Sequence, residues 1–280
     1  MKPPKVFIGI DQTGAALQKG VRAKPLPLAA IDEDEGSLRL TTAWIPSFTF
    51  EALQKALPMP INSCETAILI DCVFGLEEKV WRGLDTNIWS LFREAASDTA
   101  VRRGFGLAPA AEFFDELLRR SRVGDSFPVR RCERIAKANS VFRTRPYQKN
   151  IQCGTYRIWR DLGSSAKRWA QIRYFTPQQE VSSEKPWLFE AYPSLFWREI
   201  LGLRTRKSSA LANALKEVLP QLAISESQLT SVLKSPDLAD AVVLAVGGFM
   251  LRDRLFTGSP SRTGWLHREG WIIGLPLENG

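Results

Sequence analysis

The sequence predicts an α/β protein with a mixed β-sheet flanked by helices, and three observations support this fold class. Two short apolar runs, at residues 5–10 and 67–71, are closed by an aspartate, as expected of buried central strands that leave into a turn. Residues 26–44 between them have the composition of a hairpin. After residue 81 the apolar residues recur with a helical period. This order of elements is typical of neither a helical bundle nor a β-sandwich.

The first 71 residues contain four predicted strands and one predicted helix. Residues 32–36, with the sequence Asp-Glu-Asp-Glu-Gly, predict a solvated connection between the second and third strands, and Pro58 ends the helix. The predicted strands lie at residues 5–10, 26–31, 37–44 and 67–71, and the predicted helix lies at residues 48–57.

A mostly helical, basic insertion is predicted between the fourth and fifth strands, at about residues 81–171. Its basic residues are Arg102, Arg103, Arg119, Arg120, Arg130, Arg131, Arg134, Lys137, Arg143, Arg145 and Lys149. Residues 187–192 return to strand composition before Pro193, and the remainder is predicted to be helical apart from a strand at residues 271–273. We expect residues 1–280 to form a single domain that contains this insertion.

Composition excludes several classes of protein. The chain is 44% hydrophobic and 24% charged, which is ordinary for a globular domain. The apolar stretch 241–251 is shorter than the about 20 residues that cross a bilayer, and the first apolar run is shorter than a signal-peptide core. We therefore expect a cytoplasmic protein. Its four cysteines form no CxxC pair and are expected to be reduced, and one histidine, His267, argues against a His-rich metal site or a Ser-His-Asp triad.

The charge balance favours an anionic partner. The formal net charge is +8 and the pI is near 9.5. Excess Lys and Arg commonly neutralise a polyanion, and nucleic acid is the first candidate. The alternative is a basic surface that binds nothing.

Four acidic residues are the candidate catalytic groups: Asp11, Asp71, Glu190 and Asp240. Asp11 and Asp71 end predicted strands, although an aspartate at such a position can simply initiate a turn. Glu190 lies among apolar residues of a predicted strand, where a buried carboxylate needs a partner or a metal ion. The alternative for Glu190 is a solvent-facing position on an edge strand.

Asp240 lies in the first turns of a predicted buried helix. Ser235 as N-cap and Pro236 at the first helical position mark the start of that helix. Asp237 is explained by capping and by the helix dipole. Asp240 has no such explanation, because the helix that follows is apolar nearly all round. Since Asp237 and Asp240 share a helical face, both join Asp11 and Asp71 as candidate metal ligands.

Ligands that are all oxygen atoms suit Mg²⁺ or Mn²⁺. A pair of such ions can activate water and stabilise the leaving oxygen of a phosphodiester, which requires several carboxylates and no histidine. The sequence offers that combination, and hydrolysis of DNA or RNA is the reaction it favours.

Five segments, taken in order, resemble a family of uncharacterised proteins described as predicted RNase H-like nucleases, over essentially the whole chain. They are Ile8-Gly9-Ile10-Asp11, Ile70-Asp71-Cys72-Val73-Phe74-Gly75-Leu76, Phe189-Glu190-Ala191-Tyr192-Pro193, Asp237-Leu238-Ala239-Asp240-Ala241 and Glu269-Gly270-Trp271-Ile272. The resemblance implies an RNase H-like mixed sheet. It also implies that Asp11 ends the first strand, Asp71 the fourth, and that Asp240 lies on a C-terminal helix.

The closing Asp-x-x-Asp-Ala is similar to the ending of Holliday-junction resolvases. By that similarity Asp11, Asp71 and Asp240 would bind two metal ions for phosphodiester cleavage. Glu190 departs from the resolvase pattern, in which the second acid follows the fourth strand.

Two basic groups are candidates for nucleic-acid binding. Arg204, Arg206 and Lys207 precede a helix beginning near Ser208 and could grip phosphates near the acids, or form an ordinary charged loop. A second group, with the aromatic residues Phe142, Tyr147 and Tyr156 further along the chain, is spaced to share a helical face. That group consists of Arg131, Arg134 and Lys137. The aromatic residues would equally suit the core.

Two other functions remain open. Sugar-kinase and actin-like ATPases share the same basic sheet, and residues 11–14, Asp-Gln-Thr-Gly, loosely resemble their first phosphate loop. Residues 71–75 make a poor second phosphate loop. The other alternative is a nucleic-acid-binding protein that does not turn over its ligand. The sequence leaves the substrate and the oligomeric state undecided.

Overall fold

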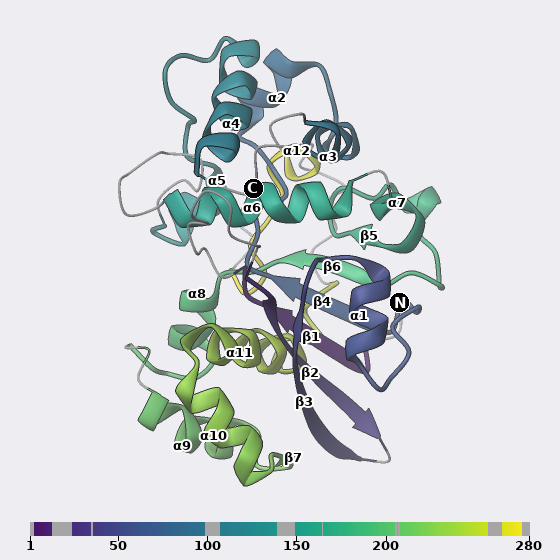
Figure 1. Cartoon of the computed structure of the whole chain (residues 1–280), viewed down its shortest axis with the longest axis vertical. Coiled ribbons are helices and arrows are strands. Elements are labelled where there is room, and N and C mark those ends of the chain that lie inside the picture. The colour runs from purple at the N-terminus through teal and green to yellow at the C-terminus, as the bar shows by residue number, and fades with distance from the viewer. Residues whose placement is uncertain are drawn as a thin grey trace.

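A mixed β-sheet flanked by helices forms the centre of the computed structural model (Figure 1). The structure describes residues 3–12, 24–34, 36–98, 107–138, 149–163, 165–204, 206, 208–256 and 265–275. Within these residues seven strands form one sheet in the order β5-β6-β4-β1-β2-β3-β7. The strands are β1 Val6–Ile10, β2 Leu26–Asp34, β3 Ser37–Ile45, β4 Thr66–Ile70, β5 Gln171–Ile172, β6 Trp187–Glu190 and β7 Leu222–Ala223. The predicted α/β class with a mixed sheet is confirmed.

Parallel pairing brings the ends of three central strands to the same edge of the sheet. Strand β1 is antiparallel to β2 and parallel to β4, and β4 is parallel to β6. Ile10 lies opposite Ile70, and Ile70 lies opposite Glu190. Whatever follows Ile10 and Ile70 along the chain is therefore held side by side.

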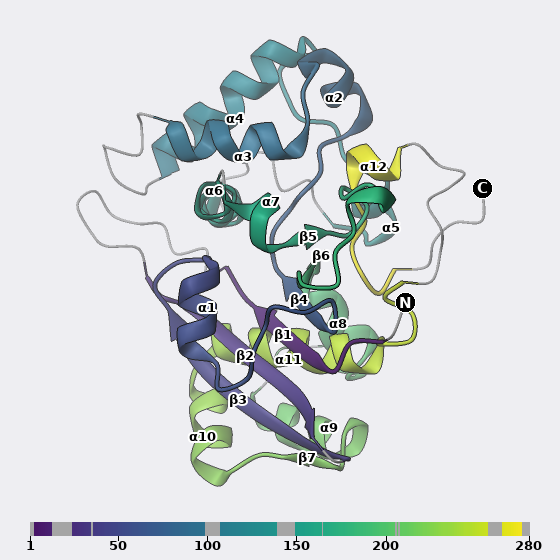
Figure 2. The same cartoon turned by 90° about the vertical axis from the view of Figure 1, so that its right-hand side faces the viewer.

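Helices cover both faces of the sheet (Figure 2). The described helices are α1 Phe50–Ala56, α2 Glu78–Leu84, α3 Ile88–Ser97, α4 Leu107–Ser121, α5 Arg131–Ile135, α6 Lys149–Leu162, α7 Ala166–Trp169, α8 Pro193–Glu199, α9 Ser208–Val218, α10 Glu226–Lys234, α11 Pro236–Met250 and α12 Leu266–Glu269. Helices α2 to α7 lie between β4 and β5, where the helical insertion was predicted. None of the described helices combines the length and apolarity that a bilayer crossing requires.

Alternation along the strands divides the core into two halves. Ile8 and Ile10 point to the face covered by the helices of the insertion, where Trp159 of α6 is fully buried. Phe7 and Leu69 point to the opposite face, which α11 covers. Successive side chains of a strand point to opposite faces, so each strand residue belongs to one half only.

Helix α11 is buried against the sheet along nearly its whole length. Its start is the predicted one, because Ser235 caps the helix by accepting a hydrogen bond from the backbone N–H of Leu238 at 3.2 Å. Gly9 of β1 permits the close approach, since a Cβ atom at that position would lie 2.0 Å from the carbonyl oxygen of Ala241. This contact fixes the first turns of α11 beside β1.

Two local expectations were wrong, and two short strands were not predicted. Strand β2 continues through the acidic residues to Asp34, and Asp32 pairs with Arg39 of β3 at 3.0 Å. Residues 271–273 form no strand, because β6 is already paired with β4 on one side and β5 on the other; only the N–H of Ile273 reaches the carbonyl oxygen of Glu190, at 2.9 Å. The two-residue strands β5 and β7 were not predicted.

Candidate carboxylate site

Asp11 and Asp71 lie side by side at the ends of β1 and β4. The backbone N–H of Asp71 donates to the carbonyl oxygen of Ile10 at 3.0 Å, which extends the parallel pairing by one residue. Both aspartates follow the alternation of Phe7, Gly9 and Leu69, and they therefore point toward α11. Only 7% of the surface of Asp11 is exposed, while Asp71 is partly exposed.

Asp240 approaches the same place from α11. Its Oδ1 atom accepts from the indole Nε1 of Trp197 in α8 at 2.5 Å, and its Oδ2 atom accepts from the guanidinium of Arg206 at 2.5 Å. Arg206 also donates to the hydroxyl of Ser194. Asp237, one turn earlier in α11, is half-buried. The first turns of α11 thus bring two carboxylates to the ends of β1 and β4. One is Asp240, which Trp197 and Arg206 hold by hydrogen bonds, and the other is the half-buried Asp237.

Burial and mutual repulsion make these carboxyl groups hold protons. The pKa of Asp11 is raised to about 9, first by burial and then by the negative charges of Asp71, Asp240 and Asp237. The pKa of Asp71 is raised to about 7 by burial and by Asp240, against the opposing charge of Arg206. Burial also raises the pKa of Asp240, which Arg206 and Trp197 partly offset. Ionising all three carboxyl groups would therefore place more negative charge in the site than Arg206 alone neutralises.

Glu190 points to the other face of the sheet. It is the last residue of β6, paired with Ile70, and it follows the alternation of Leu188 toward the helical insertion. One carboxylate oxygen accepts from the backbone N–H of Phe74 at 3.1 Å and from Arg130 at 2.9 Å, and the other oxygen accepts from Arg130 as well. The carboxylate of Glu190 is thus satisfied inside the protein, away from the three aspartates.

Arg130 is the centre of this second cluster. Its side chain is 1% exposed, and besides Glu190 it contacts Glu133 at 3.2 Å and the carbonyl oxygen of Glu269 at 2.8 Å. Glu269 in turn accepts from the backbone N–H groups of Arg131 and Glu78, at 2.8 and 3.3 Å. A buried arginine with several carboxylates ties β6, α5, α2 and α12 together. The sequence offered no signal for this pairing, because Arg130 stands among many other arginines.

The described residues contain no group of three or more His, Cys, Asp or Glu side chains arranged to hold one metal ion. Asp11 and Asp71 are adjacent, but Arg206 and Trp197 occupy both oxygens of Asp240. A cation bound by all three aspartates would have to displace Arg206. The donor set itself, carboxylate oxygen atoms with raised pKa values, suits Mg²⁺ or Mn²⁺.

Helix α6 buries polar groups on the Glu190 side of the same strand ends, and no sequence pattern pointed to them. Gln12, next to Asp11, is 2% exposed and packs against Gly154, where a Cβ atom would lie 1.7 Å from its Oε1 atom. The side-chain amide of Gln12 interacts with the carboxyl group of Asp71, and the hydroxyl of the fully buried Thr155 interacts with the thiol of Cys72.

The predicted basic groups are only partly assembled. Arg131 and Arg134 lie on α5, but the helix ends at Ile135 and Lys137 follows it with a φ of 53°, so the three do not share a helical face. Arg131 stacks over Trp265, with its Cζ atom 4.7 Å from the ring centre. Arg204 is exposed and Lys207 lies outside the described residues.

The aromatic residues expected beside α5 give no binding track. Tyr156 is in the core, where its hydroxyl donates to Asp98 at 2.9 Å, and residues 142 and 147 lie outside the described part of the chain. All four cysteines are free thiols, as expected.

Comparison of the chain with protein families, with curated proteins and with solved structures found no match.

Proposed function

We propose that this protein is a metal-dependent nuclease with an RNase H-like fold, in which Asp11, Asp71 and Asp240 bind Mg²⁺ or Mn²⁺. Supporting evidence comes from the strand order β3-β2-β1-β4-β6, with β2 antiparallel to β1 and with β4 and β6 parallel to it. Asp11 follows the first strand, Asp71 the fourth, and Asp240 lies on α11. The resemblance to RNase H-like nucleases implies these same positions.

The observation that carries the proposal is the electrostatic convergence of the three aspartates. Burial and then the neighbouring carboxyl groups raise the pKa of Asp11 to about 9 and that of Asp71 to about 7, so both groups favour holding a proton near neutral pH. A divalent cation would replace these protons and remove the repulsion. When bound, such a cation activates water and stabilises the leaving oxygen of a phosphodiester.

Trp197 and Arg206 position and neutralise the carboxylate of Asp240 in this site. Trp197 fixes the orientation of the Asp240 carboxylate through its indole N–H. Arg206, whose side chain is 46% exposed, neutralises Asp240, and a cation held by Asp240 would leave this guanidinium free to contact a phosphate. Glu190 has no part in binding the cation under this proposal, since Arg130 already neutralises it.

The test is cleavage of single-stranded, duplex and branched DNA and RNA in Mg²⁺ or Mn²⁺. Wild type is compared with Asp11→Asn and Asp240→Asn, and the exposed Asp253→Asn serves as a matched control. Metal-dependent cleavage that both site variants lose and the control keeps would support the proposal. Cleavage that survives in either site variant would overturn it.

One observation favours a second candidate, a nucleic-acid-binding protein without catalysis. Arg206 and Trp197 satisfy Asp240 without any metal, and the described residues hold no ready set of three metal ligands. Tight binding of nucleic acid with no cleavage of any substrate in Mn²⁺ would favour this candidate. No feature of the described residues favours an ATPase, whose expected first phosphate loop extends into residues outside them.

A further inference from the structure

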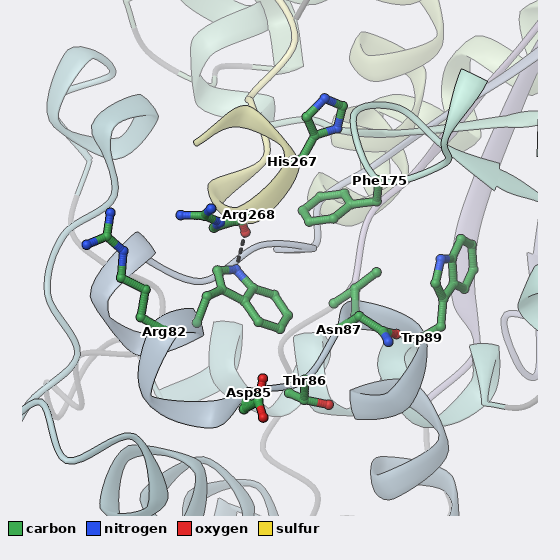
Figure 3. Close-up of a pocket in the computed structure, with 10 residues that line it drawn as sticks. Arg82, Asp85, Thr86, Asn87, Trp89, Phe175, His267 and Arg268 are labelled. Atoms are coloured by element: carbon green, nitrogen blue, oxygen red, sulfur yellow. Dashed lines mark hydrogen bonds between the residues drawn. The ribbon is translucent and has the colours of Figure 1, made fainter. Parts of the chain in front are cut away.

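A hollow lies on the side of the molecule formed by the helical insertion, between α2, the start of α3 and α12 (Figure 3). Its volume is about 320 Å³, at the lower end of the range for small-molecule sites. Phe175, which follows β5, and His267 of α12 border it on one side, and Thr86 and Asn87 lie across from them. None of the residues proposed for the carboxylate site takes part.

Three aromatic rings form the walls of this hollow. Trp81 donates its indole N–H to the carbonyl oxygen of Arg268, which fixes the ring between α2 and α12. Trp89 packs edge-on against Phe92, with ring centres 5.9 Å apart and an interplanar angle of 87°. Phe175 and Trp89 are both half-buried, so part of each ring remains accessible. Flat rings held in this way suit a planar aromatic ligand.

Polar groups lie along the segment that connects α2 to α3. Asn87 caps α3 by accepting from the backbone N–H of Ser90 at 3.1 Å, and this use of Oδ1 leaves its amide nitrogen available to donate. Asp85 has a left-handed backbone with a φ of 47° and offers carboxylate oxygens as acceptors. Thr86 adds a hydroxyl. This set of donors and acceptors matches the edge of a heterocyclic base.

Two arginines, Arg82 and Arg268, are among the residues that line the hollow. Arg82 and Arg268 both pair with Glu78, at 2.8 and 2.6 Å, and Arg131 lies 3.9 Å from the same carboxylate. Three guanidinium groups therefore share one carboxylate. The side chains of Arg82 and Arg268 are 70% and 44% exposed, so these two residues can turn toward a phosphate.

We propose that this hollow binds one nucleotide unit, with the base between the aromatic walls and the phosphate at the arginine rim. The unit could be a free nucleoside 5′-monophosphate or one nucleotide of a single strand, because the recognised chemistry is the same. The inference goes beyond the nuclease proposal, since it requires neither a metal ion nor cleavage.

The experiment measures binding of the four ribonucleoside 5′-monophosphates and of a fluorescently labelled single-stranded oligonucleotide, with EDTA present. Calorimetry serves for the monophosphates and fluorescence anisotropy for the oligonucleotide. Phe175→Leu removes a ring and keeps an apolar side chain, and Asn87→Ser keeps the helix cap and removes the amide donor. Trp44→Leu is the matched control, because Trp44 is 48% exposed on β3. Thermal unfolding shows that each variant is folded.

We expect at least one probe to bind wild type and Trp44→Leu equally. Phe175→Leu should weaken that binding roughly tenfold, the usual contribution of one base-aromatic stack. Binding of monophosphates identifies a free nucleotide as the ligand, and binding of the oligonucleotide alone identifies a strand. If neither probe binds, or if Phe175→Leu and Asn87→Ser both bind as wild type does, the inference is wrong. Because EDTA excludes cleavage, this failure would leave the nuclease proposal standing.

Discussion

Arg206 donates to Asp240 at 2.5 Å, and the same guanidinium lowers the pKa of both Asp240 and Asp71. A cation bound by Asp11, Asp71 and Asp240 together would have to displace Arg206 from this ion pair. Its removal should therefore favour metal binding.

The first prediction concerns Arg206→Gln. Loss of the guanidinium should raise the affinity for Mn²⁺ by up to about fivefold, which corresponds to the modest free energy of a partly exposed ion pair. Calorimetric titration with Mn²⁺ measures this change. Arg204→Gln, an exposed arginine in the same segment, is the control and should leave the affinity unchanged. Weaker Mn²⁺ binding by Arg206→Gln would contradict the displacement of Arg206 by the cation.

A second prediction follows from the raised pKa values. Because Asp11 and Asp71 have pKa values of about 9 and 7, a cation must displace their protons, and Mn²⁺ affinity should rise steadily from pH 6 to pH 9. Titrations at one pH in buffers of different ionisation enthalpy count the protons released. We expect release of at least one proton at pH 7. An affinity that does not change with pH would show that the cation binds elsewhere.

Stability should depend on Asp11 in the same range of pH. The pKa of Asp11 is about 9 in the folded protein and 3.8 when unperturbed, so between these values the folded state binds more protons than the unfolded state. Its contribution to the free energy of unfolding therefore falls as the pH rises through this window. Asp11→Asn should be more stable than wild type at pH 9, by roughly 1–3 kcal/mol, and nearly equal to it at pH 4. Urea unfolding at both values measures the difference, and equal stability at pH 9 would refute it.

The sequence predicted the ends of β1 and β4 and the buried helix around Asp240, because apolar runs and capping residues are local signals. It did not predict where Glu190 points. Glu190 is the last residue within its strand, whereas Asp11 and Asp71 follow theirs, and this shift of one position turns its side chain to the opposite face. The face of the sheet to which Glu190 points depends on its pairing with Ile70, and these two residues lie 120 positions apart in the sequence. The strands β5 and β7 have two residues each, too few to show a period.

Glu190 gives the fourth prediction, which separates structural from catalytic use of this carboxylate. Glu190→Gln leaves the buried Arg130 without its closest counter-charge and should lower the free energy of unfolding by about 3–5 kcal/mol. Its Mn²⁺ affinity, measured where the variant is still folded, should match wild type, whereas Asp11→Asn should lose affinity. The exposed Glu217→Gln is the control for stability. A stable Glu190→Gln variant that no longer binds Mn²⁺ would contradict this prediction and support Glu190 as a metal ligand.

The last prediction tests the contact that holds Asp240 beside β1. A methyl group on Gly9 would meet the carbonyl oxygen of Ala241 and the backbone nitrogen of Ala245, at 2.0 and 2.6 Å, and neither backbone atom can yield without moving α11. Gly9→Ala should therefore lower the free energy of unfolding by about 3 kcal/mol. Gly36→Asn is the control, because Gly36 has a φ of 82°, which asparagine tolerates, and open space around it. Where Gly9→Ala remains folded, the displacement of α11 should also weaken Mn²⁺ binding. Unchanged stability and unchanged binding would mean that α11 does not rest on β1 as described.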